Sequence, residues 1–199
     1  MEWTIPGTAL RGRRGEVEDS IRQIEGMFLG GGMIRSQLAS VSGVEAHDIQ
    51  NWVKRGFLPS PVNKRYSCRQ FCRIVIINML RSAMPMEKIC SLLSYVNGEL
   101  DDESDDLIDD TVLYFMFLRL AARAGSIGGR DNWDVAIAEI LKDYREPVPG
   151  AKERIDRVLR IMLTAWGGVQ TIRRAEQMLA QLYEEGKESA DLPPASGVG

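Results

Sequence analysis

The sequence contains few of the residues that usually carry catalysis or bind metals. It has one histidine, His47, and three cysteines among 199 residues. Cys68 and Cys72 are four residues apart, which is not the spacing of a zinc ribbon, and they leave Cys90 without a partner. A soft-metal site built from all three thiols is the less favoured alternative, because free cysteine often serves as a small apolar residue. We therefore expect free thiols, no metal, no cofactor and no enzymatic activity.

Long hydrophobic runs are absent as well. The longest, Val112 to Leu118, has seven residues, whereas a membrane-spanning helix needs roughly 20. Where a secretory signal needs an apolar segment, the chain has Trp3, Pro6 and the cluster Arg11, Arg13 and Arg14. The apolar fraction of 44% and the charged fraction of 27% are typical of globular proteins. We expect a soluble, cytoplasmic protein with no membrane partner.

Charge is unevenly distributed along the chain, whose net charge is -3. Residues 33–90 hold nine basic and three acidic side chains, a net charge of +6, whereas residues 91–199 hold 12 basic and 20 acidic ones, a net charge of -8. Such an asymmetry suits a nucleic-acid reader joined to a regulatory or oligomerising part, although solvated charged faces are also common. The basic residues of the first block are Arg35, Lys54, Arg55, Lys64, Arg65, Arg69, Arg73, Arg81 and Lys88.

The spacing of apolar residues predicts a series of helices in the first half of the chain. An amphipathic helix over residues 16–28 ends at the glycine run 30–32, which we interpret as a terminator and not as a phosphate loop. Two short helices follow on either side of Gly43, a helix-turn-helix candidate. Residues 57–66 predict a loop or small wing. A helix capped by Ser67 ends before Pro85, and another ends at Asn97 and Gly98.

The second half also has a helical pattern. An acidic segment over residues 101–110 precedes the apolar helix 112–118, which needs burial in a core or a dimer interface. Helices over residues 132–144 and 151–183 are the expected cover, the latter with a bend at Gly167 and Gly168. Because two amphipathic neighbours cover such a helix poorly, we expect this region to pair subunits. Beyond Gly186 the composition predicts disorder.

Four aromatic residues of this region allow two interpretations. They are spaced so that they could line an effector pocket between helices. Aromatic side chains at helical spacing more often fill a core, which is the favoured interpretation. The four residues are Tyr114, Phe117, Trp133 and Trp166.

The second helix of a helix-turn-helix lies in the major groove of DNA, and its first turns reach the base edges. Glu45, His47, Gln50 and Asn51 hold that place here. Glutamine and asparagine can bond adenine through a paired donor and acceptor, and a carboxylate can accept from cytosine. The polar groups expected beside them at the phosphates are Lys54, Arg55, Asn63, Lys64 and Arg65. On spacing alone, it is equally possible that these residues are simply the solvent-exposed face of an ordinary amphipathic helix.

The order and intervals of these residues resemble the N-terminal domain of the mercury-resistance-regulator (MerR) family. The resemblance rests on the segments 34–44, 49–52 and 56–59, on Tyr66, and on residues 73–74, 80–81 and 86–89. The segments 50–56, 61–64, 76–80 and 94–98 are more closely similar to a bacterial family of domains of unknown function with a MerR-like head. That second similarity continues into the acidic segment and the helix at Val112.

The resemblance implies a winged-helix head that grips a two-fold-related operator as a homodimer. The chain departs from the MerR pattern at Gln50 and Asn51, where an arginine and a tyrosine are usual, at Val53, where an acidic residue is usual, and in its shorter wing. These differences concern the usual phosphate contacts. The long C-terminal coiled coil and the cysteine metal site of the metal sensors are expected to have no counterpart.

The sequence thus predicts an all-α, mainly helical protein. It divides into an arm and amphipathic helix (1–32), a winged helix-turn-helix (33–98), a helical dimerisation or effector region (99–186) and a disordered tail (187–199). The predicted function is a transcriptional regulator that binds double-stranded DNA. The alternative is a protein-interaction module that keeps the fold without DNA binding. The residues of the reading helix that favour it are Gln50, Asn51 and the acidic Glu45 and Asp48.

Overall fold

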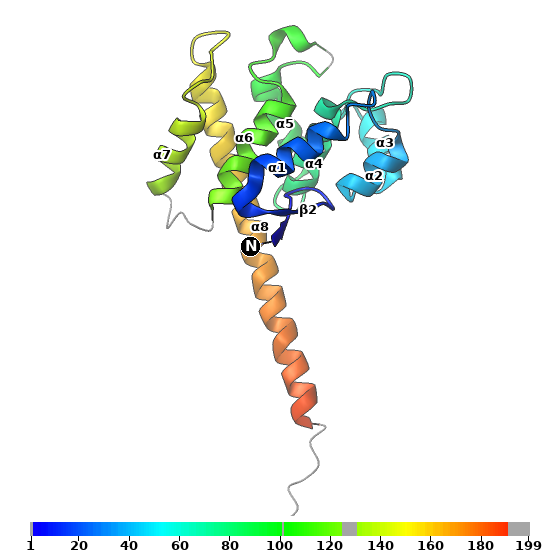
Figure 1. Ribbon diagram of the computed structural model, residues 1–199, viewed down its shortest axis with the longest axis vertical. Coiled ribbons are helices and arrows are strands. Elements are labelled where there is room, and N and C mark those ends of the chain that lie inside the picture. The colour runs from blue at the N-terminus through cyan, green and yellow to red at the C-terminus, as the bar shows by residue number, and fades with distance from the viewer. Residues whose placement is uncertain (1, 101, 125–130, 191–199) are drawn as a thin grey trace, which may run out of the picture.

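The computed structural model describes residues 2–100, 102–124 and 131–190, and these are mainly helical, as expected (Figure 1). Eight α-helices, two short 3-10 helices and one two-stranded sheet make up this part of the chain. No described helix combines the length and the hydrophobicity that crossing a membrane would require.

The first residues form an antiparallel hairpin of β1 (Glu2–Thr4) and β2 (Arg11–Arg13), with Trp3 opposite Gly12. Trp3 and Ile5 are buried. The start of the segment that the sequence assigns to an arm is therefore a hairpin packed into the core. The hairpin is missing from the sequence prediction because its strands have only three residues each and show no usable alternation.

The turn of this hairpin is fixed against the core. Gly7 has a φ of 76°, and a Cβ atom there would lie 2.2 Å from the carbonyl oxygen of Val75, so only glycine allows this approach. The Asn78 side chain donates to the carbonyl oxygens of Gly7 and Ser42 at 3.0 and 3.1 Å. The buried Tyr114 hydroxyl donates to the carbonyl oxygen of Pro6 at 2.6 Å. The N-terminus is thus an integral part of the core.

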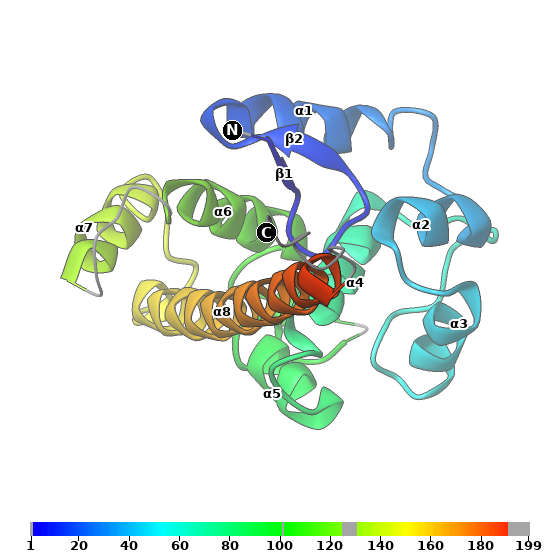
Figure 2. The same cartoon turned by 90° about the horizontal axis from the view of Figure 1, so that it is seen from below.

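The short 3-10 helix Arg14–Glu16 leads into α1 (Val17–Gly26), and α2 (Arg35–Ser42) and α3 (Ala46–Lys54) follow. Gly43 ends α2 with a φ of 70° and lets the chain turn directly into α3. Leu38 on α2 and Ile49 and Trp52 on α3 are buried. In both views these two helices lie at one edge of the body, away from α7 (Figures 1 and 2).

A tight turn at residues 62–65 and a bridge between Met33 and Tyr66 follow α3. Ser67 then caps α4 (Cys68–Leu80) by accepting from the backbone N–H of Gln70, as predicted. Almost every residue of α4 is buried. Next, α5 (Met86–Asn97) begins after Pro85 and ends at Gly98, which also agrees with the sequence prediction.

After the 3-10 turn Glu103–Asp105, α6 (Asp110–Arg123) is the central helix, and its residues 113–118 are all buried. Its cover comes from α1, α4, α7 (Asp131–Ile140) and α8. The argument that α6 needs a second subunit is therefore wrong, because the first-half helices α1 and α4 supply the missing cover. One continuous core joins residues on both sides of position 98.

The last helix, α8 (Ala151–Ala190), has 40 residues and no interruption at Gly167 and Gly168. The expected bend is absent because a glycine weakens a helix by only about 1 kcal/mol without breaking its hydrogen bonds. The helix expected over residues 151–183 is present, and it extends seven residues further, to Ala190. Figure 2 places the first half of α8 between α5 and α6, and Figure 1 shows the second half projecting from the body. Of the expected disordered tail, residues 187–190 continue α8, and residues 191–199 lie outside the described part of the chain.

Candidate nucleic-acid interface

The side chains of α3 divide into an inward apolar face and an outward polar face. Ile49 is fully buried and Trp52 is 6% exposed, and both anchor the helix to the core. The outward face continues into the segment that follows α3. All of the predicted contact residues are exposed, namely Glu45, His47, Gln50, Asn51, Lys54, Arg55, Asn63, Lys64 and Arg65.

A hydrogen bond from α2 holds one of the predicted reading residues. Arg35 donates to Oε1 of Gln50 at 2.9 Å, and both side chains are exposed. This contact fixes which way the glutamine amide points, with its NH₂ group still available as a donor. Sequence reasoning counted Arg35 among the basic residues but not among the site residues, because the 15 positions that separate it from Gln50 conceal their proximity.

The turn at residues 62–65 presents basic side chains next to α3. Two backbone hydrogen bonds between Val62 and Arg65, of 3.1 and 2.9 Å, close it. Asn63 and Lys64 have φ angles of 51° and 62°, the left-handed pair that a type I′ turn requires. The Arg65 side chain donates to the carbonyl oxygen of Gly32 at 2.8 Å and ties the turn to the segment before α2. We call residues 62–65 the tight hairpin.

Two other cations beside α3 are engaged within the molecule. Arg55 pairs with Glu87 of α5 at 3.4 Å and lies over the Phe57 ring at 4.5 Å. Arg81 pairs with Asp48 at 3.5 Å. Arg55, a predicted phosphate contact, is thus drawn toward α5 and away from the tight hairpin, although it stays exposed.

Two further members of the basic block, Arg73, which is buried, and Arg69, which is partly exposed, are paired with carboxylates inside the molecule. Arg73 is 4% exposed and lies 3.3 Å from Asp110, which is 1% exposed. Arg69 pairs with Asp106 and lies 3.6 and 3.9 Å from Asp109 and Asp110. The acidic segment that was expected to be partly a linker is therefore the counter-charge of α4. The net charge of +6 overstated the surface charge, because sequence cannot show which charges pair in space.

The pKa of the buried Asp110 carboxyl group is raised from its ordinary value. Loss of solvent raises the pKa of this carboxyl group, and the guanidinium groups of Arg73 and Arg69 lower it. Asn97 donates to the other carboxylate oxygen at 2.9 Å, so the end of α5 joins the same network. These contacts fix α4, α5 and α6 to one another behind the candidate interface.

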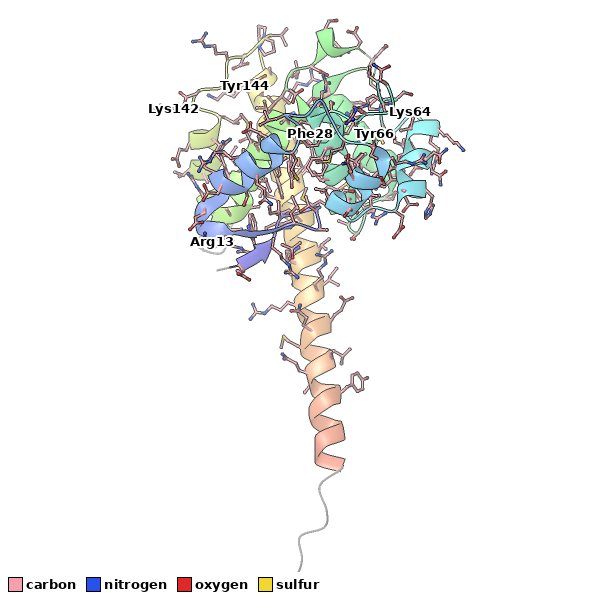
Figure 3. The ribbon with its side chains drawn as sticks, turned by 45° about the vertical axis from the view of Figure 1, so that its right-hand side comes forward. Arg13, Phe28, Lys64, Tyr66, Lys142 and Tyr144 are labelled. Atoms are coloured by element: carbon pink, nitrogen blue, oxygen red, sulfur yellow. The ribbon has the colours of Figure 1, made fainter. Side chains whose placement is uncertain are left out.

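Five exposed cations of the basic block remain: Lys88 lies apart on α5, and the other four form a compact set. Within the described part of the chain, Arg35, Lys54, Lys64 and Arg65 have no acidic partner, and all four belong to α2, α3 or the tight hairpin. Figure 3 shows Lys64 at the outer edge of the molecule, on the other side of the body from Lys142. The surface formed by α2, α3 and the tight hairpin therefore combines the side-chain amides of Gln50 and Asn51 with positive charges that have no acidic partner.

The four aromatic residues considered for an effector pocket lie in or against the core. Tyr114 and Phe117 are fully buried, and the Phe117 ring meets Trp166 edge to face at 5.9 Å. Trp133 is half-buried against the same core. A cavity of about 760 Å³ lies elsewhere, beneath the tight hairpin. Sequence reasoning missed this cavity because its walls come from four separate segments.

The described residues contain no group of three or more histidine, cysteine, aspartate or glutamate side chains arranged to hold a metal ion. The three cysteines are free thiols, with Cys68 and Cys90 partly exposed and Cys72 buried. Cys68 and Cys72 lie one turn apart on α4.

No curated protein and no solved structure matches the chain. Residues 34–117 match the model of one protein family, which is described as "Domain of unknown function (DUF1836)". The matched range begins at α2 and ends within α6, so it contains the α3 surface, the tight hairpin and the buried ion pairs. The expected continuation of the domain through the acidic segment into the helix at Val112 agrees with this range. Residues 34–117 are therefore similar to this family of domains of unknown function.

Proposed function

We propose that the protein is a transcriptional regulator that binds double-stranded DNA through α3 and the tight hairpin. The observation that carries this proposal is the surface on which Gln50 and Asn51 stand beside four cations without acidic partners. A helix–turn–helix entry to the major groove brings the first turns of α3 to the bases and the flanking cations to phosphates. The order of helix, glycine turn, helix, hairpin and helix supports the resemblance to the winged head of MerR regulators.

Each polar group on this surface has a definite role in the proposal. Gln50, oriented by Arg35, and Asn51 read base edges, with Glu45 and His47 at the entry to the groove. Lys54, Asn63, Lys64 and Arg65 hold the backbone, and Arg35 joins them as an additional phosphate contact. Arg55 has a lesser part, because its pairing with Glu87 turns it toward α5.

The proposed regulator is a homodimer on a two-fold site, and the projecting part of α8 supports this. Ile172, Leu179 and Leu182 are 59%, 52% and 65% exposed. With Ala175 they recur at alternating intervals of three and four residues, the pattern of a coiled-coil seam. We call these four residues the α8 stripe. A second copy of α8 covers it in the proposed dimer.

A protein-interaction module is the second candidate. Glu45 and Asp48 are acidic residues on the proposed reading helix, and they would face phosphates unfavourably. Asp48 is paired with Arg81, which removes part of this objection and leaves Glu45 as the observation in favour of the alternative.

Titration of a fluorescent random-sequence duplex at several salt concentrations tests the proposal. The logarithm of the affinity should fall linearly with the logarithm of the salt concentration, and Lys64→Ala should reduce that slope by about 1. Lys142→Ala, on the other side of the body, is the matched control and should leave the slope unchanged. Absence of binding at low salt would refute DNA binding and favour the interaction module.

A further inference from the structure

The cavity beneath the tight hairpin is a candidate binding site behind the DNA surface, with which it shares Asn63 and Arg65. Its volume is about 760 Å³, and it lies between the tight hairpin, the end of the helical segment at Phe28 and the start of α4. Phe28, Pro59 and Tyr66 contribute two aromatic rings and a proline ring to its wall. Figure 3 shows Phe28 and Tyr66 on the same side of the molecule as Lys64.

Charged groups stand among these apolar walls. Arg65 lines the cavity near the surface, and the nearly fully buried Arg73 and Asp110 line its deeper part. Arg65 uses one N–H group on the carbonyl oxygen of Gly32, and its other N–H groups can donate to a ligand oxygen. An apolar cavity with a few convergent donors is suited to a small, flat organic molecule that carries a carbonyl oxygen.

A thiol also lines this cavity. Cys68 is the first residue of α4, is partly exposed and lines the cavity. The neighbouring Cys72 side chain is the main cause that lowers the pKa of Cys68, and the Thr111 side chain adds to it. Burial and the nearby carboxylates of Asp109 and Glu25 act in the opposite direction.

The other two cysteines lack this combination. Burial raises the pKa of Cys72 well above its usual value, and the thiol is inaccessible. Cys90 on α5 is partly exposed like Cys68, but burial raises its pKa, and it does not line this cavity. The thiolate is the reactive form of cysteine. Accessibility and thiolate character therefore coincide only at Cys68.

We propose that the cavity beneath the tight hairpin admits small α,β-unsaturated carbonyl compounds and that Cys68 is the residue they alkylate. The Cys68 sulfur forms a bond to the β-carbon of the compound. The electron pair of the carbon–carbon double bond moves toward the carbonyl oxygen, where Arg65 stabilises the developing negative charge. Water then protonates the α-carbon, and the thiol proton has already passed to solvent. Nothing leaves and no oxidant is needed.

This reaction has a consequence for the DNA surface, and that consequence rests on the proposed function. Val62, Asn63 and Arg65 of the tight hairpin line the cavity, and Ser67 and Cys68 start α4 directly below them. An adduct on Cys68 occupies the space under the hairpin and displaces it from its place beside α3. The modified protein is therefore expected to bind DNA more weakly, by about tenfold.

The site is tested by labelling the full chain with 2-cyclohexen-1-one at pH 7 and following each cysteine by peptide mass spectrometry. Because the cavity binds the compound before the bond forms, the rate at Cys68 should saturate as the concentration rises. It should exceed the rate at Cys90 by at least about fivefold. Cys68→Ser should abolish the fast phase, and Cys90→Ser should preserve it. A linear dependence at Cys68, or equal rates at Cys68 and Cys90, would overturn the proposal.

The consequence is tested separately with the salt titration of DNA binding. Affinity lost on labelling the wild-type chain and retained on treating Cys68→Ser supports it, and equal affinity before and after labelling overturns it. If the unlabelled protein binds no DNA, the proposed function and this consequence both fail. The labelling kinetics then still decide whether the cavity and Cys68 form a modification site.

Discussion

At the tip of the tight hairpin, Lys64 adopts a conformation that lysine rarely takes. Its φ of 62° follows the 51° of Asn63, and a type I′ turn normally has glycine at the second of these positions. A side chain with a Cβ atom costs roughly 1 kcal/mol in this region. A strained residue at an exposed tip points to a use for its side chain, which in this molecule is the positive charge.

Replacing Lys64 with glycine separates stability from binding. Lys64→Gly should raise the free energy of unfolding by up to ~1 kcal/mol, since glycine adopts positive φ without strain. The same change should weaken DNA binding as much as Lys64→Ala does. Urea denaturation and the duplex titration measure the two effects. If Lys64→Gly bound DNA with unchanged affinity, the charge of Lys64 would not contribute to DNA binding.

The buried carboxylate of Asp110 makes a second prediction at the level of single residues. Asp110→Asn leaves the Arg73 guanidinium buried without its counter-charge, which should cost about 3–5 kcal/mol of stability. The double change Arg73→Met with Asp110→Leu should recover most of that loss, because it removes both charges. Asp143→Asn, at an exposed position, is the control. A loss below ~1 kcal/mol in the single variant would contradict the assigned ion pair.

Among the elements, the helices of the head are largely readable from the sequence, and α8 is only partly so. Ser67, Gly43 and Gly98 mark boundaries that local chemistry determines, and the structure confirms them. Gly167 and Gly168 misled the prediction, because the packing of Trp166 and Val169 against the body holds that part of the helix straight. Packing on a neighbouring element outweighs a local propensity of about 1 kcal/mol.

The α8 stripe makes a prediction about assembly. Leu179→Lys with Leu182→Lys places two charges on the seam and should convert a dimer into a monomer of 22.3 kDa. Ala180→Lys with Gln181→Lys adds the same charges on the outer face and should preserve the dimer. Sedimentation at micromolar concentration distinguishes the species. A wild-type chain that sediments as a monomer would contradict the homodimer and the two-fold site.

At the scale of the whole molecule, one core connects segments that the sequence suggested treating separately. The N-terminal hairpin contacts α4, and α6 packs against both α1 and α4. These contacts join positions up to 108 residues apart, as Tyr114 and Pro6 do. No local pattern records such a pairing. The exposure of the predicted contact residues could therefore be predicted from the sequence, whereas the core that supports them and the cavity beneath the tight hairpin could not.

A shared core predicts that the head and the C-terminal region unfold together. Native-state hydrogen exchange should yield the same free energy of opening for the slowest amides of α4 and of α6, because neither keeps its cover without the other. The projecting part of α8 should exchange faster as a monomer. If the free energy of opening of the slowest amides in α4 were several kcal/mol lower than that of the slowest amides in α6, the two regions would be independent folding units.

The most direct test of the account is a selection of bound sequences from a random duplex library with the full chain. The account predicts enrichment of an inverted repeat, since a two-fold dimer places two copies of α3 on related half-sites. Asn51→Ala should change the preferred bases within each half-site. If no sequence is enriched at any salt concentration at which the protein binds the library, or if the protein binds none of it, the proposal of a sequence-reading regulator is contradicted.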